Sequence, residues 1–105
     1  GIIQLFKTER HAKFHAFAAV CVMLAGLFFK ISKIEWFIVV FAIGIVIASE
    51  AFNTAIEKLS DEVCSSQNER IGLVKNVAAG AVLICAIAAA VIGLMVFLPY
   101  CIALI

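Results

Sequence analysis

Four polar side chains in the middle of the chain are spaced so that they share one face of a helix. Glu50, Asn53, Glu57 and Asp61 are separated by three, four and four residues. At about 100° per residue, this spacing keeps all four within an arc about 80° wide. Three carboxylates and one amide on a single face can act together in one site.

Glu50 is the most informative of these residues because apolar residues precede it. An ionisable side chain on a membrane helix costs at least about 2.5–3.5 kcal/mol near the bilayer centre. Positions three and four residues away on either side carry no basic residue that could neutralise Glu50. We therefore expect this carboxylate to face a helix-bundle interior, a cavity or a cation.

Stacked carboxylates on a membrane helix suit two chemical tasks. They can bind a hard divalent cation such as Mg²⁺ through oxygen, and they can remove a proton from a hydroxyl group. Phosphoryl transfer to an alcohol needs both. The alternative is that Glu57 and Asp61 are interfacial acids that pair with Lys58 and Lys75.

Polar residues that could bind a nucleotide follow the acidic stripe along the chain. Lys75 could meet a phosphate, or it could be an interfacial lysine whose stem lies along apolar surface. Lys75 and Asn76 precede a run of small residues at 77–81, which ordinary helix packing also explains. The chain has no glycine-rich phosphate-binding motif, so we place the nucleotide beside the polar residues Ser66, Gln67 and Asn68. We read His11 and His15 as interfacial residues, and Glu9 taken alone as a solvated charge.

The composition of the chain indicates the surroundings of the helices that carry these groups. Of the 105 residues, 66% are apolar and 14% are charged, against about 45–50% and about 25% in soluble proteins. A soluble domain of this length would bury only about two thirds of its surface, so lipid must cover the remaining apolar side chains. A net charge of +1 without a basic cluster argues against nucleic acid as a partner.

Three apolar stretches predict an all-α integral membrane protein with one domain over residues 1–105. We expect spans at about 14–32, 35–59 and 76–98, the second passing through Glu50 because a span needs about 20 residues. Residues 30–33 read as a tight link and residues 60–73 as a polar surface loop, and Pro99 falls near the end of the third span. The four cysteines lack C-x-x-C spacing and predict neither a disulfide nor a zinc site.

The distribution of basic residues predicts the orientation. By the positive-inside bias, the N-terminus and the connection between the second and third spans are cytoplasmic. Lys30 and Lys33 lie on the opposite side, near Trp36 as an aromatic anchor. The basic residues on the cytoplasmic side are Lys7, Arg10, Lys13, Lys58, Arg70 and Lys75. One three-helix protomer offers little interior to shelter the polar stripe, so we also expect a homo-oligomer.

Two sequence blocks resemble those of the prokaryotic diacylglycerol kinase and undecaprenol kinase family. Glu50-Ala-Phe-Asn-Thr-Ala-Ile-Glu57, followed by Asp61, resembles the signature E-A-x-N-[ST]-A-I-E-x-x-x-D. Residues 75–82, Lys-Asn-Val-Ala-Ala-Gly-Ala-Val, resemble K-D-x-A-A-G-A-V. Residues 9–15 also resemble the E-R-N-x-R-x-H stretch of the undecaprenol branch.

The resemblance implies an ATP- and Mg²⁺-dependent lipid kinase of the bacterial inner membrane, assembled as a homotrimer with sites between protomers. It implies that Glu50 is the proton acceptor, that Asn53 supports it, and that Glu9 and Glu57 hold Mg²⁺. It also implies that Lys75 contacts the nucleotide. The substrate would be undecaprenol or, alternatively, diacylglycerol.

Two features depart from the family pattern. Asn76 stands where the family has aspartate, which favours an inactive homologue or a non-catalytic membrane assembly as the alternative function. The chain also begins at Gly1 without a methionine, so we expect much of an N-terminal surface helix to be missing.

Overall fold

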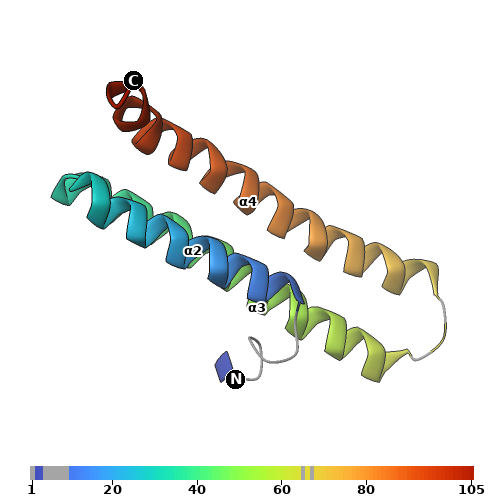
Figure 1. The fold of residues 1–105 in the computed structure, drawn as a ribbon. Coiled ribbons are helices and arrows are strands. Elements are labelled where there is room, and N and C mark those ends of the chain that lie inside the picture. The colour runs from blue at the N-terminus through green and yellow to red at the C-terminus, as the bar shows by residue number, and fades with distance from the viewer. Residues whose placement is uncertain (1, 4–9, 65, 67) are drawn as a thin grey trace.

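In the part of the chain from residue 10 onward that the structure describes, three long helices run lengthwise beside one another (Figure 1). The computed structural model describes residues 2, 3, 10–64, 66 and 68–105. The helices are α2 (Arg10–Phe29), α3 (Lys33–Val63) and α4 (Glu69–Ala103), and α3 packs against both of the others. Each helix is long and apolar enough to span a membrane, which confirms the predicted all-α architecture with three spans.

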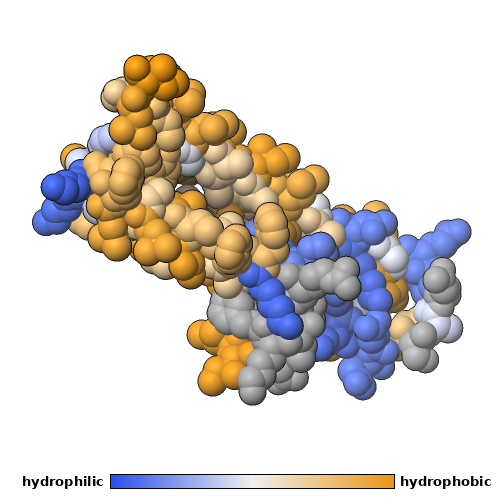
Figure 2. Space-filling model, viewed as in Figure 1, coloured by the Kyte–Doolittle hydropathy of each residue, from blue (hydrophilic) through white to orange (hydrophobic). Residues whose placement is uncertain are grey.

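The surface of the molecule is that of a protein solvated by lipid. Among the described residues no large side chain is completely buried, and alanines such as Ala12, Ala19, Ala42 and Ala78 make up much of the interior. Phenylalanine, leucine and isoleucine side chains point outward along all three helices. Figure 2 shows this apolar surface over most of the visible face, with hydrophilic residues gathered at the two ends. The longest dimension is 54 Å, so the helix ends extend beyond a hydrocarbon layer of about 30 Å.

A tight turn joins α2 to α3, as the sequence predicted for residues 30–33. Lys30 adopts the left-handed conformation with φ of 53°, which is common just after a helix end. Ser32 then caps α3, because its hydroxyl accepts a hydrogen bond from the Glu35 N–H while Glu35 Oε1 accepts one from the Ser32 N–H. This reciprocal capping box satisfies two backbone donors that the helix itself leaves free.

Gly26 allows α2 and α3 to approach closely above this turn. A Cβ atom on Gly26 would lie 2.7 Å from Cη2 of Trp36, well inside normal contact. We therefore expect Gly26→Ala to lower the free energy of unfolding by about 1–3 kcal/mol through overpacking. Thermal melting in detergent micelles would measure this effect. Gly44→Ala is the matched control, because its added Cβ meets nothing within 4 Å, and equal melting temperatures for the two variants would contradict the close approach.

The connection between α3 and α4 is shorter than the sequence suggested. The prediction of a loop over residues 60–73 was wrong at both ends, because α3 continues to Val63 and α4 begins at Glu69. Asn68 starts α4 by accepting hydrogen bonds from the N–H groups of Arg70 and Ile71 through its side-chain oxygen. Polar composition marks where the chain leaves the apolar layer, but a helix can continue into water beyond that point.

The far end of α4 closes against the beginning of α3. Pro99 lies inside α4, which continues to Ala103, and the Tyr100 hydroxyl donates a hydrogen bond to Glu35 Oε1. Ile31, Val39 and Val96 form the buried cluster at this end, with Trp36 and Phe97 packed against it. The three helices are thereby held together at the end opposite the polar stripe.

Candidate active site

Glu50 is buried in the single chain, with only 5% of its surface exposed. The expectation that one protomer has too little interior to shelter the polar stripe therefore fails at Glu50, whereas Asn53 and Glu57 stay partly exposed. The partner of Glu50 comes from α2, where His15 Nε2 lies 3.4 Å from Glu50 Oε1. Sequence reasoning correctly found no basic partner along the same helix, but it read His15 as an interfacial residue. The signal that could have found His15 is its place at the end of the block formed by residues 9–15.

Asn53 and Glu57 form the next layer of the stripe. The Asn53 side-chain N–H donates a hydrogen bond of 2.9 Å to Glu57 Oε1. The other polar atom of the amide, Asn53 Oδ1, is buried and has no hydrogen-bond partner among the described residues. Because buried polar atoms are normally satisfied, this oxygen is available to a cation, a water molecule or a donor on a ligand.

The oxygen donors in this layer fit a hard divalent cation, although they form only part of a coordination sphere. Mg²⁺ is usually held by one or two carboxylates together with water and substrate phosphates. Glu57 supplies one carboxylate and Asn53 a free amide oxygen, while Glu9, the second predicted ligand, lies outside the described residues. Within the part of the chain that the structure describes, no group of three or more His, Cys, Asp or Glu side chains is arranged to hold a metal ion.

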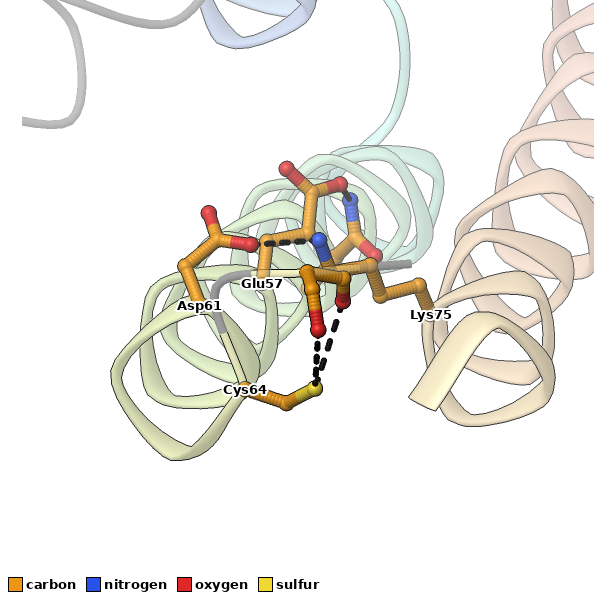
Figure 3. A network of polar contacts seen from close by, with 6 residues as sticks. Glu57, Asp61, Cys64 and Lys75 are labelled. Atoms are coloured by element: carbon orange, nitrogen blue, oxygen red, sulfur yellow. Dashed lines mark hydrogen bonds and ion pairs between the residues drawn. The ribbon is translucent and has the colours of Figure 1, made fainter. Parts of the chain in front are cut away.

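A polar cavity of about 230 Å³ lies where α3 and α4 approach their connection. Figure 3 shows Lys75 reaching from α4 to Asp61 on α3, and the two side chains form an ion pair. The sequence left this pairing open as the alternative to a phosphate contact. Glu57, by contrast, accepts from Asn53. The residues that line the cavity are Asp61, Cys64, Ser66, Asn68, Ile71, Gly72 and Lys75.

The predicted nucleotide-binding residues are only partly brought together. Ser66 and Lys75 line the polar cavity, and so does Asn68, although its side-chain oxygen caps α4. Asn76 is exposed and does not line the cavity, and Gln67 lies outside the described residues. Sequence reasoning missed Cys64, whose thiol donates a hydrogen bond to the Ser66 carbonyl oxygen; an isolated cysteine outside an apolar run gave no signal for that position.

A second cavity, of about 280 Å³, opens between the three helices. It lies on the side of Glu50 that is away from the polar cavity. Its lining is apolar except for His15, which therefore borders both the cavity and the Glu50 carboxylate. Small residues on α4 leave space for this cavity because their side chains do not fill it. The α4 lining residues are Ala86, Ala89, Ala90, Ile92 and Gly93, and those of α2 and α3 include Ala18, Ala19, Val22, Val39, Ala42 and Val46.

The surroundings of the site thus change from polar to apolar along α3. The site begins at the polar cavity beside Asp61, passes the Asn53–Glu57 layer, and reaches Glu50 about 16 Å away at the helical rise. The apolar cavity begins there. Such an arrangement can receive a water-soluble anionic molecule at one end and an apolar molecule at the other, with a carboxylate between them.

Comparisons with known proteins agree with this arrangement. The family model described as prokaryotic diacylglycerol kinase matches residues 1–97. An undecaprenol kinase of Bacillus subtilis is 39% identical over 99 residues, which cover 94% of this chain and 80% of that protein. A diacylglycerol kinase of Synechocystis is 34% identical over 100 residues, which cover 94% of this chain and 57% of that protein.

Proposed function

Because this chain belongs to the prokaryotic diacylglycerol kinase family, we propose that it transfers the terminal phosphoryl group of ATP to the hydroxyl of a membrane lipid. The observation that carries the proposal is the buried Glu50 carboxylate, which lies between a polar cavity and an apolar cavity. A carboxylate in this place can meet an alcohol at the edge of the hydrocarbon layer. The protein is then a multi-pass protein of the bacterial inner membrane with a cytoplasmic N-terminus.

Glu50 acts as the general base of the reaction. Its carboxylate accepts the proton of the lipid hydroxyl while the hydroxyl oxygen forms a bond to the terminal phosphorus of ATP. The bond between that phosphorus and the leaving ADP oxygen breaks. In such transfers the protein contributes mainly by positioning the reactants and by neutralising charge.

Glu57, with Glu9, would hold Mg²⁺ when the ion is bound, and Asn53 would support this layer. The unpartnered Asn53 oxygen and the Glu57 carboxylate are donors of the type that Mg²⁺ prefers. The metal supplies charge neutralisation for the phosphates when it is bound. Asn53 keeps the Glu57 carboxylate oriented through its hydrogen bond.

The nucleotide binds in the polar cavity, beside Ser66, Asn68 and Lys75. Gln67 and Asn76 are further proposed contacts of the nucleotide outside the lining of this cavity. Lys75 is the cation of this cavity that can meet a phosphate, and for that it exchanges Asp61 for the nucleotide. Such an exchange between two anionic partners costs little because both Lys75 and Asp61 are partly exposed. The triphosphate of the bound ATP then extends along α3 towards Glu50.

The lipid chain occupies the apolar cavity and enters sideways from the bilayer. We propose undecaprenol as the substrate, since the relative with the higher identity is named undecaprenol kinase and residues 9–15 resemble that branch. Diacylglycerol is the alternative, after the name of the second relative. Phosphate transfer from radiolabelled ATP to each lipid in mixed micelles tests both. Transfer to neither lipid by a folded protein would support the inactive homologue instead.

Glu57→Gln should weaken nucleotide binding in a magnesium-dependent way, because the amide loses the charge that attracts the cation. We expect the magnesium concentration at half-maximal activity to rise about tenfold, equivalent to about 1.4 kcal/mol. A magnesium titration of the transfer rate measures this shift. Glu69→Gln is a control on an exposed acid at the start of α4, and a Glu57→Gln titration that matches it would count against Glu57 as a ligand.

We further propose that the chain assembles as a homotrimer. The apolar side chains exposed along all three helices are compatible with further copies of the chain as well as with lipid. If each site uses two protomers, mixing Glu50→Gln protomers with Lys75→Ala protomers restores part of the activity that each variant lacks alone. Crosslinking across a concentration series measures the number of copies. Monomers at every concentration, or mixtures that stay inactive, would contradict the shared site.

A further inference from the structure

The contact between His15 and Glu50 has no part in the reaction as proposed so far. His15 Nε2 lies 3.4 Å from Glu50 Oε1, and the two side chains are 18% and 6% exposed. A polar contact so shielded from water is screened less than a surface pair. It also joins two helices, since His15 belongs to α2 and Glu50 to α3. The imidazole is therefore placed to influence how the carboxylate is oriented.

The other described surroundings of Glu50 offer it few alternatives. On its own helix the nearest polar side chains on the same face are Asn53, whose N–H is given to Glu57, and Thr54, which is buried one turn further along α3 and carries no N–H in its side chain. On α4, residues 77–98 contain no charged side chain, and Cys85 is their one titratable group. His15 is thus the cationic or N–H-bearing side chain that the described structure brings to Glu50 from another helix.

The ring of His15 is itself held in place. Its edge-to-face contact with Phe14 has a centroid separation of 5.6 Å, a geometry that aromatic rings favour. Both His15 and Phe14 line the apolar cavity. A neutral imidazole has one N–H donor and one acceptor nitrogen, so a proton on Nε2 would point towards the carboxylate.

We propose that His15 is a positioning residue for Glu50, a role that rests on the proposed function. Its Nε2–H donates to one carboxylate oxygen and leaves the other oxygen free to accept the proton of the lipid hydroxyl. The 3.4 Å separation shortens when the reactants are bound, as catalytic contacts commonly do. Because a free carboxylate rotates between equivalent orientations, loss of the donor lowers the rate of transfer more than the binding of either substrate.

Three variants separate this role from simple packing. His15→Leu keeps a similar volume in the apolar lining but removes the donor, and kcat should fall at least tenfold with both KM values within about twofold of the parent. His15→Gln carries an amide N–H at a similar reach, and kcat should recover to within about threefold of the parent. His11→Leu, an exposed histidine on the same helix, is the matched control and should remain active.

The activity series has outcomes that overturn the proposal separately from the proposed function. An active parent whose His15→Gln variant is as slow as His15→Leu defeats positioning by donation. An active parent with an unaffected His15→Leu variant defeats any role for His15. A folded parent that transfers phosphate to neither lipid defeats the proposed function, and with it the role of His15 in transfer.

A second measurement tests the contact without activity. The chain has two histidines, so a protein labelled with ¹⁵N in its histidines gives two sets of imidazole signals, which the His11→Leu variant assigns. In Glu50→Gln the His15 signals should shift because the charged acceptor is lost, while those of His11 stay in place. His15 signals that are identical in the parent and in Glu50→Gln would overturn the contact and the proposal built on it.

Discussion

Glu50→Gln should reduce phosphoryl transfer by about 10²–10⁴-fold, the usual contribution of a general base. The substitution preserves the shape of the side chain and removes its ability to take a proton. Folding should be unaffected, because a neutral amide in this buried place is no harder to accommodate than a carboxylate. Nucleotide binding should also remain, since the polar cavity lies about 16 Å along α3. Rates measured with saturating ATP and lipid, beside a nucleotide-binding assay, test both parts.

The control for this prediction is Glu62→Gln, which makes the same change at an exposed acid near the end of α3. It should keep the parent rate. If Glu50→Gln keeps more than about a tenth of the parent rate, Glu50 is not the base. If Glu50→Gln also loses nucleotide binding, its effect is on the structure of the site and the assignment fails.

Asn76→Asp should raise the transfer rate at saturating lipid at least tenfold, about 1.4 kcal/mol of barrier. The family pattern that the sequence resembles has aspartate here, and an amide retains the hydrogen-bonding shape without the charge. A charge-assisted hydrogen bond is roughly twice as strong as a neutral one. In the structure Asn76 follows Lys75 on α4, and Lys75 already pairs with one carboxylate, that of Asp61. A carboxylate at position 76 provides a second anionic neighbour when Lys75 turns to the nucleotide.

Stability should barely change in Asn76→Asp, because the residue is exposed near the beginning of α4. Asn76→Gln, which remains neutral, is the control and should show no gain. An unchanged rate in Asn76→Asp together with a fully active parent would mean that this charge is dispensable. If the parent and Asn76→Asp are both folded and transfer phosphate to neither undecaprenol nor diacylglycerol, the chain is an inactive homologue or a non-catalytic membrane assembly.

The sequence alone determined the membrane architecture and the polar stripe. Hydropathy decides which segments enter lipid, and the spacing of Glu50, Asn53, Glu57 and Asp61 decides that they share a helix face, whatever the helix packs against. The turn at residues 30–33 was equally readable, because it depends on residues close to one another in the chain. The comparisons then confirmed the family that the two sequence blocks resembled.

Only the tertiary structure decided what each of these residues meets. It placed His15 against Glu50, joined Lys75 to Asp61, left Asn53 Oδ1 without a partner among the described residues, and opened an apolar cavity beside His15. It also extended α3 and α4 into the segment expected to be a loop. The pairings and the cavity depend on the rotation and depth of one helix against another. Local periodicity specifies a helix face, whereas the residues facing it are chosen by packing between segments far apart in the chain.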